Sequence, residues 1–167
     1  MKILISHISD DITFFDFTGK KEDFNIPMLS KDVQVDISIY HSGGSYTSSG
    51  TIKTGFKLTC DRCLGKYDFD INTSFNVIFT SEEDTVKDDH LMLLSPQDVE
   101  INFMPYVRET LILNIPFKKL CSTECKGLCA KCGVNLNYEL CSCKREQYDP
   151  RWNKLKELKK SLENAEE

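Results

Sequence analysis

Apolar and polar residues alternate along the first part of this chain, which is typical of β-strands with one buried face. Between Val33 and Ile39 every second residue is Val or Ile, and the residues between them are polar. Ser42–Gly44 then supplies turn residues, and Tyr46–Thr59 follows with a second strand pattern. The pattern therefore predicts two strands joined by a short turn.

Three further segments also have the strand pattern. Met1–Ser9 and Asp11–Gly19 are strand candidates on either side of an acidic turn. A longer strand is predicted from Tyr67 to Phe79, with a change of phase that allows a β-bulge near Asn72–Ser74. Because the connections are short, we expect an antiparallel sheet or a partial barrel.

One helix is predicted over Glu100–Pro116 to cover the sheet. Pro105 is tolerated only in the first turn of a helix, so the helix should begin close to Asn102, which can cap it. Pro116 should end it. The expected apolar face, with Ile101 leading in, comprises Ile101, Met104, Val107, Leu111, Ile112 and Ile115.

A second helix is predicted after Asp149, which can cap it, with Pro150 at the first helical position. Its narrow apolar stripe comprises Trp152, Leu155, Leu158 and Leu162. This stripe either docks on the rest of the chain or binds a partner protein.

Charge is unevenly distributed along the chain. The 167 residues have a net charge of −5, which does not resemble a globally basic nucleic-acid-binding protein. Residues 1–116 carry −8, including an acidic loop expected at Ser81–Asp89, whereas residues 117–160 carry +6. The basic part is either a nucleic-acid contact or a solvated surface, and four metal-bound thiolates would reduce its positive charge.

The sequence predicts a cytoplasmic protein. Met1–Ile8 is short and three aspartates follow it by position 16, so no signal peptide is expected. No run of about 20 apolar residues predicts a membrane span. Thiols stay reduced in the cytoplasm, so clustered cysteines favour metal binding over disulfides.

The strongest chemical signal is the set of eight cysteines. Cys60 and Cys63 form one C-x2-C pair, and the other six follow the spacing C-x3-C-x3-C-x2-C-x8-C-x-C from Cys121 to Cys143. Two thiolates of a C-x2-C turn can bind one zinc ion, and a following glycine helps the turn by adopting positive φ. Gly133 fits this role, and Gly65 fits it less closely.

These spacings predict one or two structural Zn²⁺ ions. One site is assigned to Cys129, Cys132, Cys141 and Cys143. A second would combine Cys60, Cys63, Cys121 and Cys125, although the two glycine-flanked pairs could instead share one ion. Four thiolates leave no open position on zinc, so the ions should be structural. Because large apolar residues are few between Cys121 and Cys143, this segment should unfold locally without metal.

The predicted fold class is α+β. An antiparallel β-sheet or partial barrel with a covering helix would occupy residues 1–116, a zinc module residues 117–148, and a C-terminal helix and tail residues 149–167.

No constellation in the sequence argues for catalysis, so the chain is not expected to be an enzyme. His7, His41 and His90 are scattered, and the acids near the first cysteine pair, Asp61 and those at 68–70, resemble turn and strand residues. The alternatives are a thiol redox enzyme, a zinc-dependent RNA-processing enzyme, and a zinc-module transcription factor.

In combination, several segments resemble the YceD family of large-subunit ribosomal RNA accumulation proteins. The resemblance covers roughly residues 33–158. The segments that carry it are Leu58–Leu64, Val107–Pro116, Cys125–Gly133, Asn135–Asn137 and Asp149–Trp152. It implies a bacterial-type cytoplasmic factor, and it marks Cys60, Arg62, Cys63 and the segment Gly127–Gly133 as important.

The resemblance leads us to expect a non-enzymatic factor in large ribosomal subunit biogenesis that binds ribosomal RNA, a large-subunit ribosomal protein, or both. No membrane and no small-molecule substrate are expected. The acidic sheet region suits a basic protein. Contacts to RNA phosphates would come from Lys118, Lys119, Lys126, Lys131, Lys144, Arg145 and Arg151.

Overall fold

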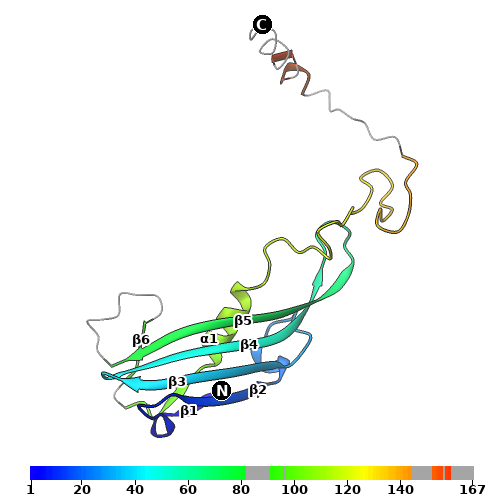
Figure 1. Ribbon diagram of the computed structural model, residues 1–167. Coiled ribbons are helices and arrows are strands. Elements are labelled where there is room, and N and C mark those ends of the chain that lie inside the picture. Colours follow the sequence, from blue (N-terminus) through cyan, green and yellow to red (C-terminus); the bar gives the residue numbers. More distant parts are fainter. Residues whose placement is uncertain (82–90, 96, 144–151, 156, 159–167) are drawn as a thin grey trace. The chain divides into compact units, whose positions relative to one another are not determined.

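Three long strands form the centre of the main sheet in the computed structural model (Figure 1). They are β3 (Val33–Ser42), β4 (Ser45–Thr59) and β5 (Lys66–Thr80). The alternating Val and Ile residues of β3 are at most 1 % exposed, which confirms the predicted half-buried strand. Gly43 and Gly44 both have positive φ, and this allows the two-residue turn between β3 and β4.

The main sheet has the strand order β2-β3-β4-β5-β6. Strand β2 (Thr13–Gly19) pairs antiparallel with β3, whereas β6 (Leu91–Leu93) pairs parallel with β5. The β-bulge that the predicted change of phase allowed near Asn72–Ser74 is not formed, because β4 and β5 pair without interruption from Ser45↔Thr80 to Thr59↔Lys66. The sheet is thus mostly antiparallel, with one parallel pair.

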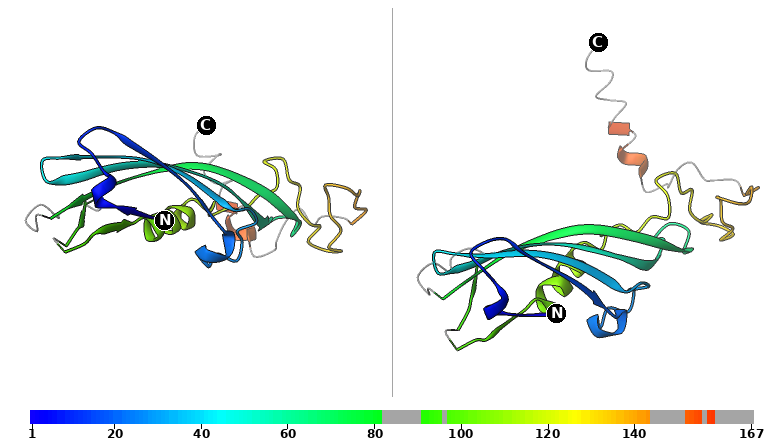
Figure 2. Two further views of the ribbon diagram at one scale, coloured as in Figure 1. Left: turned by 90° about the horizontal axis from the view of Figure 1, so that it is seen from below. Right: turned by 60° about the horizontal axis from the view of Figure 1, so that its bottom comes forward.

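A second layer covers one face of this sheet (Figure 2). It contains a small sheet of β1 (Lys2–Leu4) and β7 (Glu100–Asn102), together with helix α1 (Met104–Leu113). Two short 3-10 helices, η1 (Ile5–His7) and η2 (Lys21–Phe24), follow β1 and β2 along the chain. The protein is therefore α+β with few helices, in agreement with the coarse prediction.

The start of the predicted covering helix is wrong. Residues 100–102 form β7, in which Ile101 pairs with Ile3 of β1, and α1 begins only at Met104. The N-cap is Phe103 and not the predicted Asn102, although Asn102 Oδ1 accepts a hydrogen bond from the Met104 backbone N–H at 3.1 Å. The helix ends at Leu113, before Pro116.

The core lies between the main sheet and this covering layer. Val107 and Leu111 of α1 are fully buried against it, whereas Ile112, expected on the same face, is 41 % exposed. Phe103, which precedes the helix, packs its ring against Phe75 and Phe79 of β5. The helix thus packs on one face of the main sheet, and the other face of the sheet is exposed to solvent.

The structure describes residues 1–81, 91–95, 97–143, 152–155 and 157–158. The chain divides into two compact units, Met1–Cys125 and Lys126–Glu167. The predicted acidic loop and the start of the second predicted helix lie outside the described residues; residues 153–155 and 157–158 are helical. In the described part of the chain, no helix is long and apolar enough to cross a membrane.

Candidate metal centres

The eight cysteines gather in two groups of four. The hairpin cluster comprises Cys60, Cys63, Cys121 and Cys125, and the C-terminal cluster comprises Cys129, Cys132, Cys141 and Cys143. Within each cluster all sulfur atoms lie within 4.8 Å of one another. These are the two sets considered first from the spacing, and the alternative grouping of the two glycine-flanked pairs has no counterpart among the described residues. Metal binding itself stays a prediction.

The distances between sulfur atoms suit a tetrahedral metal site. In the hairpin cluster, Cys60 Sγ lies 3.8 Å from Cys125 Sγ, and Cys63 Sγ lies 3.7 Å from Cys121 Sγ. In the C-terminal cluster, Cys141 Sγ lies 3.5 Å from Cys132 Sγ and 3.3 Å from Cys129 Sγ. Four sulfurs at the usual zinc–sulfur distance are about 3.8 Å apart. The donor set and its geometry therefore fit zinc.

The first cysteine of each cluster begins the same turn. In the hairpin cluster, the Cys60 carbonyl accepts a hydrogen bond from the Leu64 N–H, and the Cys60 N–H donates to the Gly65 carbonyl, each at 2.9 Å. In the C-terminal cluster, Cys129 makes the equivalent bonds to Gly133 and Val134 at 2.9 and 2.8 Å. The turn curls the chain so that both thiols of a C-x2-C pair face one point.

The residue after the second cysteine of each turn has positive φ. Gly133 has φ of 74°, as the sequence led us to expect. In the hairpin cluster the equivalent residue is Leu64, with φ of 57°, and not the glycine that follows it. A side chain is unfavourable in this left-handed conformation. The Leu64 side chain is 65 % exposed, so packing contributes little to holding it there.

The hairpin cluster is built on the end of the β4–β5 hairpin. The turn Cys60–Gly65 connects these two strands, so its two cysteines are positioned by the sheet. The residues between them hold the other half of the cluster. Asp61 donates its N–H to the Lys119 carbonyl at 2.8 Å and accepts the Lys119 N–H on Oδ2 at 2.7 Å.

Arg62 makes a second connection across the hairpin cluster. Its Nη1 donates to the Cys125 carbonyl at 2.8 Å and to the Thr123 carbonyl at 3.3 Å. Asp61 and Arg62 together attach the segment that carries Cys121 and Cys125 to the hairpin. The resemblance had marked Arg62 but gave it no role, and Asp61 was considered only as an acid. In the sequence, the sign of these contacts is that both residues between Cys60 and Cys63 are charged.

The C-terminal cluster is held by short-range contacts within its own segment. Leu128 and Asn135 form an isolated β-bridge, and the Leu136 N–H donates to the Gly127 carbonyl at 2.9 Å. The Asn137 side chain accepts the Lys126 N–H on Oδ1 at 2.7 Å. Among the described residues of Lys126–Glu167, only Gly127 is buried.

Backbone amides stabilise one thiolate in each cluster. The N–H of Cys121 is the main cause that lowers the pKa of Cys60 to about 6, and the N–H of Cys132 does the same for Cys129, whose pKa is also about 6. Sharing protons with neighbouring thiols raises the pKa of Cys121 and Cys143 to about 12. In each cluster one cysteine, Cys60 or Cys129, is thus the easiest to deprotonate. A bound cation would favour deprotonation of the other three.

The basic residues considered from the sequence for RNA contact are divided between the two units. Lys118 and Lys119 belong to the first unit, and Lys126 and Lys131 belong to the second. The remaining three basic residues of that set lie outside the described residues. The described residues of the predicted apolar stripe, Trp152, Leu155 and Leu158, are 57, 55 and 57 % exposed.

Comparison with known proteins assigns the family. Residues 48–159 match the family described as "Large ribosomal RNA subunit accumulation protein YceD". The chain belongs to the YceD family. The matched residues include all eight cysteines of the two clusters. No solved structure matches the chain significantly.

Several curated proteins resemble this YceD-family chain. A chloroplastic large ribosomal RNA subunit accumulation protein, YCED homolog 1 of Arabidopsis thaliana, is 25 % identical over 162 residues, which cover 80 % of this chain and 50 % of the plant protein. The Zea mays homolog 1 is 27 % identical over 143 residues, which cover 67 % of this chain and 48 % of the maize protein. An uncharacterised Mycobacterium bovis protein is 25 % identical over 130 residues, with 75 % and 61 % covered. The chain thus spans about half the length of the plant relatives.

Proposed function

We propose that this YceD-family chain is a non-enzymatic factor in large ribosomal subunit biogenesis, which binds ribosomal RNA or a large-subunit ribosomal protein. The family description and the plant relatives' name both refer to accumulation of large-subunit ribosomal RNA. The observation that carries the structural part of the proposal is the presence of two four-thiol clusters inside the matched residues. Each would hold a structural zinc ion.

The chemistry of the clusters supports a structural role. A zinc ion with four thiolate ligands has no open position for water or substrate, so it would hold chain segments together instead of activating a reactant. In the hairpin cluster, Cys60, Cys63 and Cys125 are at most 8 % exposed. Such an ion would fasten the Cys121–Cys125 segment to the end of the hairpin.

Depletion of the protein from its native cell tests the proposed function. Ribosomes would be separated on a sucrose gradient, and large-subunit ribosomal RNA and its precursors would be measured. We expect fewer mature large subunits and more precursor RNA. The wild-type chain should restore the profile, whereas Cys60→Ser/Cys63→Ser should not. A normal profile after complete depletion would contradict the proposal.

A thiol redox enzyme is the second candidate, because Cys60 and Cys63 form a C-x2-C pair, the spacing of redox dithiols, and backbone N–H groups lower the pKa of Cys60. The same pair of serine substitutions separates the two functions. A redox role predicts a folded chain that keeps its metal content and loses only activity. A structural role predicts loss of one zinc ion and of stability in the hairpin cluster.

A further inference from the structure

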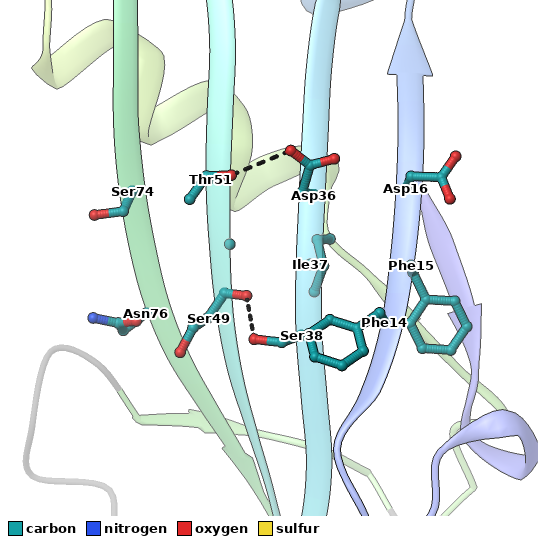
Figure 3. Close-up of a pocket in the computed structure, with 11 residues that line it drawn as sticks. Phe14, Phe15, Asp16, Asp36, Ile37, Ser38, Ser49, Thr51, Ser74 and Asn76 are labelled. Atoms are coloured by element: carbon teal, nitrogen blue, oxygen red, sulfur yellow. Dashed lines mark hydrogen bonds between the residues drawn. The ribbon is translucent and has the colours of Figure 1, made fainter.

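The solvent face of the main sheet contains a hollow of about 430 Å³, on the side away from α1 (Figure 3). Its floor consists of short polar side chains on β3, β4 and β5: Ser38, Ser49, Thr51, Ser74 and Asn76. They come from two successive cross-strand rows of the sheet. Apart from Asp36, the residues of these two rows on β3, β4 and β5 have short polar side chains, so the surface is lower there.

Two carboxylates lie on neighbouring strands at one side of this hollow (Figure 3). Asp16 of β2 and Asp36 of β3 are directly opposite in the sheet register, an arrangement that is unfavourable for like charges. Asp36 has Lys53 Nζ at 3.8 Å and accepts a hydrogen bond from Thr51 at 3.4 Å. In the described part of the chain, no ion pair or hydrogen bond reaches the Asp16 carboxylate. A cation bound between the two carboxylates would relieve their repulsion.

An exposed aromatic ring, next to Ser38, lines the same hollow (Figure 3). Phe14 precedes Asp16 by two residues on the same face of β2, lines the hollow, and is 77 % exposed. A planar guanidinium stacks on an aromatic face while its N–H groups pair with carboxylates. Phe14, Asp16 and Asp36 therefore provide both kinds of contact that an arginine side chain makes.

The charge of the surrounding unit favours a basic partner over a nucleic acid. Met1–Cys125 contains 12 Lys/Arg and 19 Asp/Glu. RNA phosphates would be repelled by the carboxylates at this hollow, whereas a Lys/Arg-rich segment would be attracted. The hydroxyl and amide groups on the floor can bond to the backbone of an extended peptide.

We propose that this hollow binds an extended, arginine-containing basic segment of a partner protein. One arginine side chain lies over Phe14 with its guanidinium between Asp16 and Asp36, and the peptide runs across the serine-rich floor. The proposal deepens the proposed function by giving the chemistry of a protein partner, and it rests on that function for the partner's identity.

Fluorescence anisotropy with the full chain tests this site. The probe is a labelled peptide of about ten residues that alternates arginine and serine, and a labelled oligouridine RNA of about 20 nucleotides is measured in parallel. Asp16→Asn/Asp36→Asn should weaken peptide binding about tenfold. Phe14→Ser should weaken it about threefold. The matched control Glu22→Gln/Asp23→Asn changes the net charge equally on η2, outside the hollow, and should have little effect.

Three results would overturn the proposal. The first is no peptide binding by the wild type at about 1 mM, the weak limit of specific recognition. The second is equal weakening by the hollow and control variants, which would show unspecific charge attraction. The third is RNA binding that the hollow variants abolish. These results leave the ribosome profile after depletion unaffected, so failure here is distinguishable from failure of the proposed function. Circular dichroism of each variant verifies the fold.

Discussion

The two cysteine clusters contain the same turn around their first cysteine, yet the rest of the protein supports them differently. In the hairpin cluster, Cys60 and Cys63 lie in the turn that connects β4 and β5. Asp61 and Arg62 attach the segment with Cys121 and Cys125 by hydrogen bonds. The C-terminal cluster has short-range contacts in its own segment, and three of its four cysteines are half-buried while Cys132 is exposed. The comparison indicates that a metal would reinforce the first cluster and would largely create the second.

Metal removal should give the largest difference between the clusters. A structural zinc ion contributes roughly 10–16 kcal/mol in small peptides, and a segment without a core has little to replace it. After chelation under reducing conditions, we expect the amides of Cys129 and Leu136 to lose protection from hydrogen exchange. The β4–β5 ladder should keep its protection. Unchanged protection at Cys129 and Leu136 in the metal-free chain would show that the segment folds unaided.

Variants that lack one cysteine of a single cluster should show how much each cluster contributes to the stability of the sheet. Cys60→Ser leaves a buried site incomplete, so the unfolding temperature of the sheet should fall by about 10 °C. Cys129→Ser should leave that temperature almost unchanged, because the C-terminal cluster belongs to the other compact unit. Differential scanning calorimetry measures both. Equal shifts for the two variants would mean that the units unfold together.

Arg62 allows a smaller test of how the hairpin cluster is held. Arg62→Ala removes two hydrogen bonds from a charged group and should reduce the free energy of unfolding by about 1–2 kcal/mol. Arg62→Lys keeps the charge but not the planar guanidinium whose Nη1 makes both bonds, so it serves as the matched variant and should recover only part of the loss. Urea titration measures these values. Full recovery by lysine would show that charge alone is required.

The two residues with positive φ after the cysteine turns should give the smallest effects. Leu64→Gly removes a side chain from a left-handed conformation and should stabilise the hairpin cluster by about 1 kcal/mol. Gly133→Ala places a side chain in that conformation and should destabilise the C-terminal cluster by a similar amount. Thermal unfolding and zinc-release rates measure each change. A loss of stability in Leu64→Gly would reveal a packing role for this exposed leucine.

Local patterns were sufficient for the parts of the fold whose partners are close in sequence. The strand at Val33–Ile39 was predicted from its alternation, because one face is buried and the partner follows after a two-residue turn. Helical periodicity also identified Val107 and Leu111. The strand at residues 100–102 was missed because Ile101 is buried by pairing with Ile3, about one hundred residues earlier. No local pattern reports such a contact.

Strand β5, for which a change of phase was predicted, shows a related difficulty. Thr73 occupies an inward position opposite Ile52, and this polar residue in the apolar series was interpreted as a change of phase. Tyr67, Phe69 and Phe75 nevertheless face the same side as Thr73, so the alternation is regular. A single polar residue on a buried face was therefore taken for a structural irregularity.

For the candidate sites, cysteine spacing was more informative than the residues around it. Spacing and the requirement for four ligands led to the two groups that the structure brings together. The contacts of Asp61 with Lys119 and of Arg62 with Cys125 join segments about sixty residues apart, so they could not be derived from spacing. The hollow beside Phe14 was missed for the same reason, since its rows span four strands.

Metal counting by native mass spectrometry tests the central claim most directly. The full chain, purified under reducing conditions, should carry two zinc ions, one for each four-cysteine group. Cys60→Ser/Cys63→Ser and Cys129→Ser/Cys132→Ser should each carry one. A metal-free wild-type chain, or the same metal content in all three proteins, would contradict the assignment of one structural zinc ion to each cluster.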